Sequence, residues 1–262
     1  MAQTYRTTGY EPLNTLKPVA RDIWIIDGPH VLRNRMPIST RATVVKLEND
    51  DLWVHAPTPL TEDLRAELSV IGRVAHLVVP NQRHFTHIAQ WQAAYPDAQA
   101  WAAPNVAEAS AKAGHALQFD HDLGAAPEAP WDGEIDQTIV EGSKTHREVV
   151  FHHRGSSTLI IADLVANVET SKLPAWMRPL VWLAGTDESD GKMPPALKWS
   201  FRNKEKLADG IDVMVSWRPR RMILAHGRWY KSGAVDELER AFRKLLSNRR
   251  WNAVMENMPK DS

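Results

Sequence analysis

Three segments of the chain share one pattern, an apolar stretch that ends in residues able to bind metal or carry protons. AHLVVPN runs into QRHFTH, TLIIAD ends in Asp163, and RMILAH ends in His226. Such apolar stretches predict buried strands, and ligands gather beyond the carboxyl ends of strands in α/β sheets. We therefore expect His84, His87, Asp163 and His226 to meet at one rim of the fold.

The residue types available limit the chemistry of such a site. The chain has 11 His and no Cys, which excludes disulfides, thiolate metal sites and a cysteine nucleophile. A metal ion must then be held by imidazole and carboxylate, which are good ligands for Zn, Fe or Mn. Three such ligands and one open position would be sufficient for hydrolysis, because a bound divalent ion lowers the pKa of water toward neutrality.

Each of these residues also has a structural interpretation. His84 and His87 are three residues apart at an expected helix start, where histidines often only cap or pack. Asp163 follows an apolar strand and could be a turn former. His226 could be a buried histidine with satisfied hydrogen bonds. Taken together, their order along the chain favours a common site.

The elements that must position these residues are short strands and amphipathic helices. We expect strands at 22–26, 42–47, 52–55, 74–79, 98–102, 137–140, 148–152, 158–162 and 221–225. We expect helices at 60–71, about 84–95, 106–113 and about 234–246, and a surface loop at 120–133. His55 ends one of these strands and would lie near the same rim.

Several segments resemble the metallo-β-lactamase superfamily. HLVVPNQRHFTHIAQW resembles the strand, loop and helix that carry its HxHxDH motif, TLIIADL its strand ending in the bridging aspartate, and ILAHG its last strand and terminal histidine. More narrowly, LWVHAP, VVPNQRHF, the W-x-x-x-Y-P of residues 91–96 and EVVFHHRGSSTLIIADLVANV are similar to the branch known as domain of unknown function 4336.

The resemblance implies a fold and a domain organisation. It implies the α/β class, with a metallo-β-lactamase-like αββα sandwich in which two packed mixed sheets carry helices outside. It also implies a single domain over residues 1–262, with an N-terminal extension at 1–20 and a lid or insertion at 170–210.

The motif itself is incomplete in this chain. Laid on residues 82–87, HxHxDH has Gln82 at the first histidine and Thr86 at the aspartate, which leaves His84 and His87 as matches. Ser143 falls where the next histidine ligand would be, and the nearby residues His146 and Glu148 could substitute for it.

The remaining residues imply one metal position. The superfamily's second position would keep His87, Asp163 and His226, whereas the first would keep His84 and Asp163. We therefore predict one divalent ion, Zn or Fe/Mn, at the second position with His84 nearby. Asp163 would orient the nucleophilic water or accept its proton, and His55 is a candidate neighbour of the ligands or proton-transfer residue.

By this resemblance the protein is a metal-dependent hydrolase of a small molecule that the sequence does not identify. The alternative is a non-catalytic relative whose degenerate pocket binds a small molecule or a protein partner. One fold hosts many chemistries, so the residues of the site must distinguish these two functions. GxSxG and the GxxxxGK[ST] and GxGxxG phosphate motifs are absent.

The charge balance and the hydropathy of the chain limit the classes of partner that we expect. Lys+Arg and Asp+Glu both number 32, so nothing in the balance indicates nucleic acid. No apolar run approaches the roughly 20 residues of a membrane span, and no signal peptide is recognisable, so we expect a cytoplasmic protein. LPAWMRPLVWLA at 173–184 could be a lid, a homodimer contact or a membrane-surface patch, although packing on the core is the interpretation we favour.

Overall fold

The first of two β-sheets has seven strands in chain order. The computed structural model describes residues 10–33, 36–189 and 191–256. The strands of this sheet are β1 (Leu16–Ala20), β2 (Ile23–Arg33), β3 (Met36–Lys46), β4 (Asp51–His55), β5 (Arg73–Val79), β6 (Gln99–Ala102) and β7 (His121–Asp122). Strands β1 to β4 pair antiparallel and β4 to β7 pair parallel, so the sheet is mixed.

The second sheet has four strands in the order β11-β10-β9-β8. They are β8 (Ile135–Val140), β9 (Glu148–His153), β10 (Thr158–Ile161) and β11 (Arg221–Leu224). Strands β8, β9 and β10 pair antiparallel, whereas β10 and β11 run parallel. The parallel pair therefore brings the carboxyl ends of β10 and β11 to the same edge.

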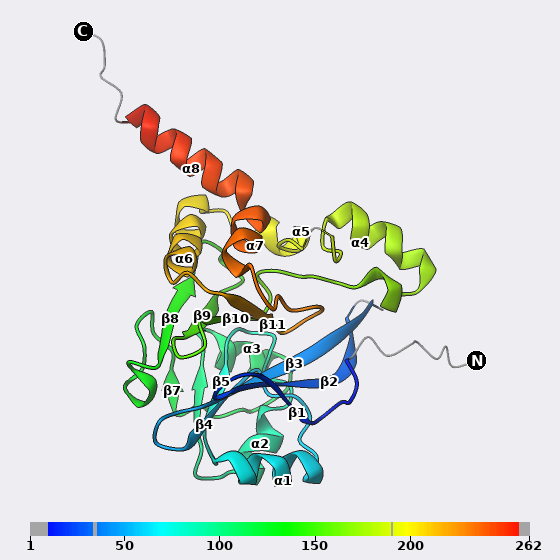
Figure 1. Ribbon diagram of the computed structural model, residues 1–262, viewed down its shortest axis with the longest axis vertical. Coiled ribbons are helices and arrows are strands. Elements are labelled where there is room, and N and C mark those ends of the chain that lie inside the picture. Colours follow the sequence, from blue (N-terminus) through cyan, green and yellow to red (C-terminus); the bar gives the residue numbers. More distant parts are fainter. Residues whose placement is uncertain (1–9, 34–35, 190, 257–262) are drawn as a thin grey trace.

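Helices cover the outer faces of both sheets (Figure 1). The α-helices are α1 (Glu62–Ile71), α2 (Ile88–Ala94), α3 (Val106–Lys112), α4 (Arg178–Ala184), α5 (Pro195–Ser200), α6 (Lys204–Ser216), α7 (Ala234–Ala241) and α8 (Arg243–Glu256). Short 3-10 turns occur at Ala129–Trp131, Thr170–Lys172 and Ala175–Met177. Helices α1 and α2 contact β5 of the first sheet, and α6 contacts β8 of the second.

The second sheet is buried on both faces, and successive side chains along its strands point alternately into two different hydrophobic cores. Along β9, Val149 and Phe151 join the core shared with the first sheet, whereas Val150 joins the core beneath the helices. Along β10, Ile160 faces the first core and its neighbours face the second. This period of two is the geometry of a strand between two layers. The expected αββα sandwich with two mixed sheets is thus confirmed.

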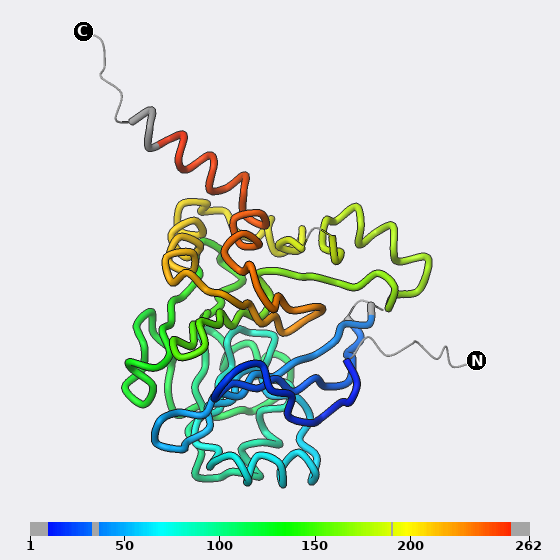
Figure 2. The backbone as a smooth tube through the Cα atoms, viewed as in Figure 1, coloured from blue at the N-terminus to red at the C-terminus, as the bar shows by residue number. Residues whose placement is uncertain are grey.

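Some element boundaries differ from those expected. The helix expected over 84–95 begins only at Ile88, and the one expected over 234–246 is divided at Phe242 into α7 and α8. Helix α8 then extends away from the body of the molecule (Figure 2). Within the predicted N-terminal extension, residues 1–9 lie outside the described residues, and β1 pairs with β2 as an edge strand of the sheet.

The predicted insertion at 170–210 contains two 3-10 turns, α4, α5 and the start of α6. Leu173, Met177 and Val181 form a small buried cluster of their own, separate from the two main cores, and other apolar side chains of the segment are exposed. No helix in the described residues combines the length and the apolar character that crossing a membrane requires.

Candidate metal centre

Three of the four expected ligands meet at the carboxyl ends of the strands. Asp163 follows β10, His226 follows β11, and His84 lies in the loop after β5. The Nε2 atom of His226 is 3.3 Å from Oδ1 of Asp163, and Nε2 of His84 is 3.7 Å from Oδ2. The two imidazole rings stack with centroids 5.1 Å apart. Their ligand atoms all lie within 4.8 Å of one another, as one metal ion requires.

The carboxylate of Asp163 is held in its charged form. The residue is 6% exposed, and this burial by itself raises its pKa. The imidazoles of His226 and His84 act in the opposite direction and hold the pKa of Asp163 well below its usual value. Asn81 also donates a hydrogen bond of 3.1 Å from Nδ2 to Oδ2. Asp163 therefore offers an ionised oxygen to a cation.

The backbone sets the tautomer of His226. Its Nδ1 lies 2.7 Å from the carbonyl oxygen of Ser39, which can only accept a hydrogen bond, so Nδ1 carries the proton. In the neutral ring Nε2 is then an unprotonated lone pair directed at the Asp163 carboxylate. Two acceptors facing each other repel unless a proton or a metal cation lies between them, and a positive charge in that place is what holds the pKa of Asp163 low. A proton donated to a carbonyl by the distal nitrogen is also how metal-bound histidines are usually oriented.

The distances fit tetrahedral coordination. Ligand atoms about 2.0–2.2 Å from a tetrahedral ion are separated from one another by about 3.3–3.6 Å. The separations of 3.3 and 3.7 Å from His226 and His84 to Asp163 are close to this range. In addition, Nε2 of His84 is buried without a hydrogen-bond partner. A bound cation would satisfy that nitrogen, so these three residues fit a divalent ion.

His87 lies outside this group. It is the N-cap of α2, and its ring nitrogens belong to neither cluster of possible ligands in the described residues. The reason is the late start of α2. Residues before Ile88 form a turn, in which Asn81 accepts hydrogen bonds from the backbone N–H groups of Arg83 and His84. His84 and His87 thus lie on a turn and a cap, not on one face of a helix.

The positions that lack the expected ligands differ in their surroundings. Gln82 is half-buried and Thr86 is exposed, so neither fills a closed pocket. Ser143 is 8% exposed and donates to Oγ of Ser200 at 2.9 Å. Its Oγ also accepts the backbone N–H of His146, which makes it a turn former. Only the Ser143 corner of the site is therefore closed.

A second group of possible ligands, His146, Glu148 and Asp163, lies deeper in the protein. Glu148 is fully buried, and its two oxygens accept the backbone N–H groups of Ala162 at 2.8 Å and Asp163 at 2.9 Å. Oε2 also accepts a hydrogen bond from Asn81. Glu148 thus holds the end of β10 in place, and its Oε2 also lies 3.4 Å from Nε2 of His146.

Asn81 was not singled out from the sequence. It is fully buried, and its Nδ2 lies 3.1 Å from oxygens of both Glu148 and Asp163. The amide therefore joins two carboxylates and fixes the orientation of the one that faces the histidines. Its place directly after the strand pattern of residues 74–79 was the available signal, but an Asn followed by Gln and Arg also suits an ordinary turn.

His55 lies beside the centre and is neutral. The residue is 1% exposed and contacts Trp53 and Phe151. Burial, and then the nearby charge of His84, lowers the pKa of His55 to about 3. Such a ring is a poor proton acceptor at neutral pH. Its position suits the other expectation, a neighbour of the ligands.

The family model described as "Domain of unknown function (DUF4336)" matches residues 20–193. The chain belongs to this family. A search of curated proteins found no match.

Solved structures show that the DUF4336 chain has the metallo-β-lactamase-like fold. The DIM-1 metallo-β-lactamase exposed to ceftazidime matches with TM-score 0.62 and 13% identity, covering 89% of this chain and 96% of that one. A metallo-β-lactamase from Erythrobacter litoralis matches with TM-score 0.61 and 12% identity over 87% and 96%. The Flv1 flavodiiron core from Synechocystis sp. PCC6803 matches with TM-score 0.57 and 10% identity over 90% of this chain and 61% of that one. At these identities the similarity shows the fold.

A buried ion pair of the DUF4336 chain supports the loop that carries His226. Arg41 on β3 is 2% exposed and lies 2.7 Å from Oδ1 of Asp27 on β2. Its NH1 group donates to the carbonyl oxygens of Leu224 at 2.7 Å and Gly227 at 2.8 Å. These carbonyls flank His226, so Arg41 fixes the backbone on both sides of a ligand. No sequence pattern links Arg41 to this loop, which lies 183 residues or more along the chain.

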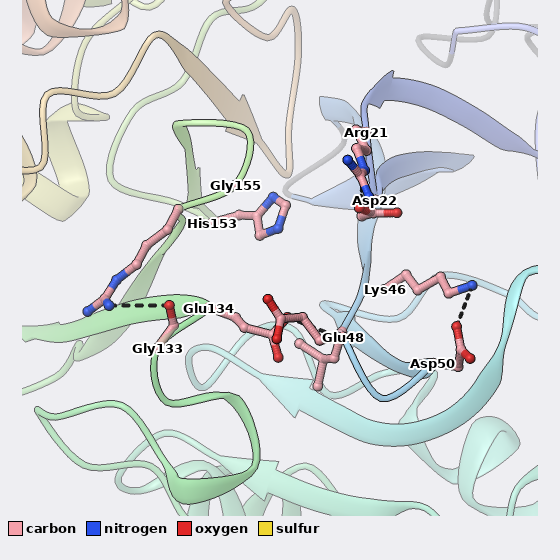
Figure 3. A pocket seen from close by; sticks show the side chains of 11 residues that line it. Arg21, Asp22, Lys46, Glu48, Asp50, Gly133, Glu134, His153 and Gly155 are labelled. Carbon is pink, nitrogen blue, oxygen red and sulfur yellow. Dashed lines mark hydrogen bonds and ion pairs between the residues drawn. The ribbon is translucent and has the colours of Figure 1, made fainter.

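Two cavities lie at opposite ends of the sheets. A small one is lined by His226, Ser39, Ile38, Val168 and Lys172, beside the candidate centre. A larger one, of about 790 Å³, lies at the amino end of β10, where Glu134, Glu48, Asp22 and His153 line it (Figure 3). The larger cavity contains none of the candidate ligands and is therefore separate from the centre.

Proposed function

We propose that this DUF4336 chain is a metal-dependent hydrolase whose centre binds one divalent ion through His84, Asp163 and His226. The observation that carries the proposal is the pairing of two imidazole nitrogens with one carboxylate. The Ser39 contact occupies Nδ1 of His226 and leaves its Nε2 facing Asp163, and Nε2 of His84 is buried without a hydrogen-bond partner. The ligand set thus replaces the expected His87 with His84.

An ion bound there would supply Lewis acidity, which polarises a substrate bond and lowers the pKa of water toward neutrality. The residues of the chain supply the rest. Asp163 stays ionised and presents one carboxylate oxygen to each imidazole. Asn81 prevents that carboxylate from rotating. His226 keeps its orientation because the backbone carbonyl oxygen of Ser39 accepts a hydrogen bond from its Nδ1–H group. The neutral ring of His55 excludes water from the inner side.

One ion, not two, is proposed because of the surroundings of the positions where the usual ligands are missing. The Ser143 corner is closed by Ser200, and Glu148 is committed to backbone N–H groups. Three ligands with a position left open match the arrangement of catalytic zinc sites, whereas closed four-ligand sites are structural. Zn, Fe and Mn all accept imidazole and carboxylate ligands.

The test is hydrolysis measured before and after metal removal. Purified protein, chelator-treated protein and protein reconstituted with Zn, Fe or Mn are assayed against chromogenic β-lactam, thioester, phosphodiester and lactone substrates. We expect one substrate class to be hydrolysed only by metal-loaded protein. His84→Ala and His226→Ala should abolish this activity, and His87→Ala, the matched control, should retain it.

The alternative is a non-catalytic relative with a degenerate pocket. Protein that binds no metal after reconstitution, and shows no hydrolysis of any class, would favour this alternative. Equal loss of activity in the His84→Ala and His87→Ala variants would instead show that the ligand set is wrong.

A further inference from the structure

Large exposed apolar side chains are concentrated at one end of the molecule. In the described residues they are Val31, Leu32, Val70, Trp176, Leu180, Trp182, Leu183, Trp199, Val213 and Trp251. Most belong to or adjoin α4, α5 and α8. These helices lie at the end of the long axis opposite to α1, which carries Val70 (Figure 1). Monomeric soluble proteins rarely gather such side chains on one surface without an interaction to make there.

Helix α4 and the turn before it are apolar on two sides. Leu173, Met177 and Val181 are buried against each other. Trp176, Leu180 and Leu183, spaced four and three residues apart, are 58%, 58% and 75% exposed. Leu180 and Leu183 lie within α4 and share one face of it, and Trp176 adjoins the helix from the 3-10 turn Ala175–Met177. The outer face of α4 is thus apolar and uncovered by the described residues.

Helix α5 adds an exposed tryptophan among cations. Trp199 is 75% exposed, and its neighbours Lys198, Arg202 and Lys204 are exposed too. In the part of the chain that the structure describes, no carboxylate forms an ion pair with these three cations. Partial burial, and then the charges of Lys198 and Arg202, lower the pKa of Lys204. The three positive charges are therefore close enough to repel one another.

The two helices are anchored to the same strand-like segment. Val168 bridges to Asp187 just after α4, and Ala166 bridges to Lys192 just before α5. Val168 also lines the cavity that contains His226. The exposed apolar residues of α4 and the cations in and just after α5 are thus held by the same segment, residues 166–168, next to the candidate centre.

We propose that this region, α4 with Trp176 together with α5 and the cations Lys198, Arg202 and Lys204 in and just after it, docks onto the surface of an anionic phospholipid membrane. Tryptophan and leucine insert at the level of the headgroups, where an aromatic ring with one polar edge is favoured. Lysine and arginine beside them are attracted to anionic lipids. A second copy of the chain is a poorer occupant, because a symmetric contact through this region would bring its like charges together. The proposal is independent of hydrolase activity.

Vesicle co-sedimentation tests the proposal with the full chain. Vesicles of phosphatidylcholine with phosphatidylglycerol are compared with vesicles of phosphatidylcholine alone. We expect binding to the anionic vesicles that weakens as salt is added. The double variants Trp176→Ser/Leu183→Ser and Lys198→Glu/Arg202→Glu should each weaken it by about tenfold or more. Val70→Ser, which removes an exposed apolar side chain at the opposite end, should bind as the wild type does.

Three outcomes would overturn the proposal. The first is no binding of the wild type to anionic vesicles. The second is equal binding by the wild type and both double variants, whose folding is checked by circular dichroism. The third is a wild-type dimer on a sizing column that Trp176→Ser/Leu183→Ser converts to a monomer, without vesicle binding, which would assign the region to a second copy.

Discussion

Replacing Arg41 by Met should destabilise the protein strongly. The substitution removes a buried guanidinium that pairs with Asp27 and donates to the carbonyl oxygens of Leu224 and Gly227. Removing one partner of a buried pair costs about 3–5 kcal/mol, because the other charge stays buried. Here Lys17 still contacts Asp27 at 2.9 Å. We therefore expect a loss near the lower end, about 3 kcal/mol in the free energy of unfolding.

A double-mutant cycle separates the ion pair from the rest of this loss. Asp27→Asn alone leaves Arg41 charged and buried, and Asp27→Asn with Arg41→Met removes both charges. The double variant should be more stable than the sum of the single losses predicts, by about 1–3 kcal/mol. Urea unfolding of metal-free protein, followed by circular dichroism, measures each value without a contribution from the metal.

The same variant should weaken metal binding. Leu224 and Gly227 flank His226, so loss of their common donor frees the backbone that orients this ligand. Supporting contacts of this kind typically contribute about 10–100-fold to metal affinity. A loss of stability below about 1 kcal/mol in Arg41→Met, together with unchanged metal affinity, would refute the argument that this ion pair supports the centre.

Four further substitutions have expected outcomes. Burial lowers the pKa of His153 in the folded protein from 6.5 to about 4. As pH falls below 6.5, this side chain therefore becomes protonated in the unfolded chain before it does in the folded protein, and the folded protein loses stability. His153→Asn should therefore remove about 1–2 kcal/mol of the stability that the wild type loses between pH 7 and pH 5, measured by urea unfolding; parallel pH profiles would contradict this. Gly227→Ala should cost about 2–4 kcal/mol, because φ is +75° and a Cβ would lie 2.1 Å from a backbone oxygen. Gly114→Ala, at φ +84° with open space around it, should cost about 1 kcal/mol, and equal melting temperatures would contradict the steric argument. Asn81→Leu should lower metal affinity by about tenfold or more in a competition assay with a chelating dye, since Asp163 loses its orienting donor; unchanged affinity would rule that function out.

Much of the fold follows from the sequence because the strands are short apolar stretches with clear ends. Residues 74–79, 158–162 and 221–225 were expected as strands, and β5, β10 and β11 occupy nearly these ranges. Asp163 and His226 could be placed at one rim for the same reason. Each lies two residues beyond the end of one of the two parallel strands of the second sheet.

The boundaries that sequence reasoning missed depend on tertiary contacts. The spacing of residues 84–95 suits a helix, yet Asn81 holds residues 82–84 in a turn and α2 begins later. This shift removes His87 from the ligand group and leaves His84 in it. Local periodicity could not anticipate a turn stabilised by a fully buried side chain.

The contacts that support the candidate ligands could not be predicted from the sequence for a different reason. The backbone carbonyl of Ser39 accepts a hydrogen bond from the ring of His226, 187 residues away in the chain. The carboxylate of Glu148 accepts hydrogen bonds from backbone N–H groups at the end of β10. Ser39 belongs to no motif, and Glu148 was expected only as a substitute ligand. Such contacts arise only when two sheets pack together, and the residue types involved are common in turns and strands.

Anomalous diffraction at the metal edge tests the central claim most directly. Crystals of protein reconstituted with zinc should give one strong peak per chain, about 2.0–2.2 Å from Nε2 of His84, Nε2 of His226 and an oxygen of Asp163. A peak coordinated by His87, a second peak between His146 and Glu148, or no peak at full zinc loading would contradict the account.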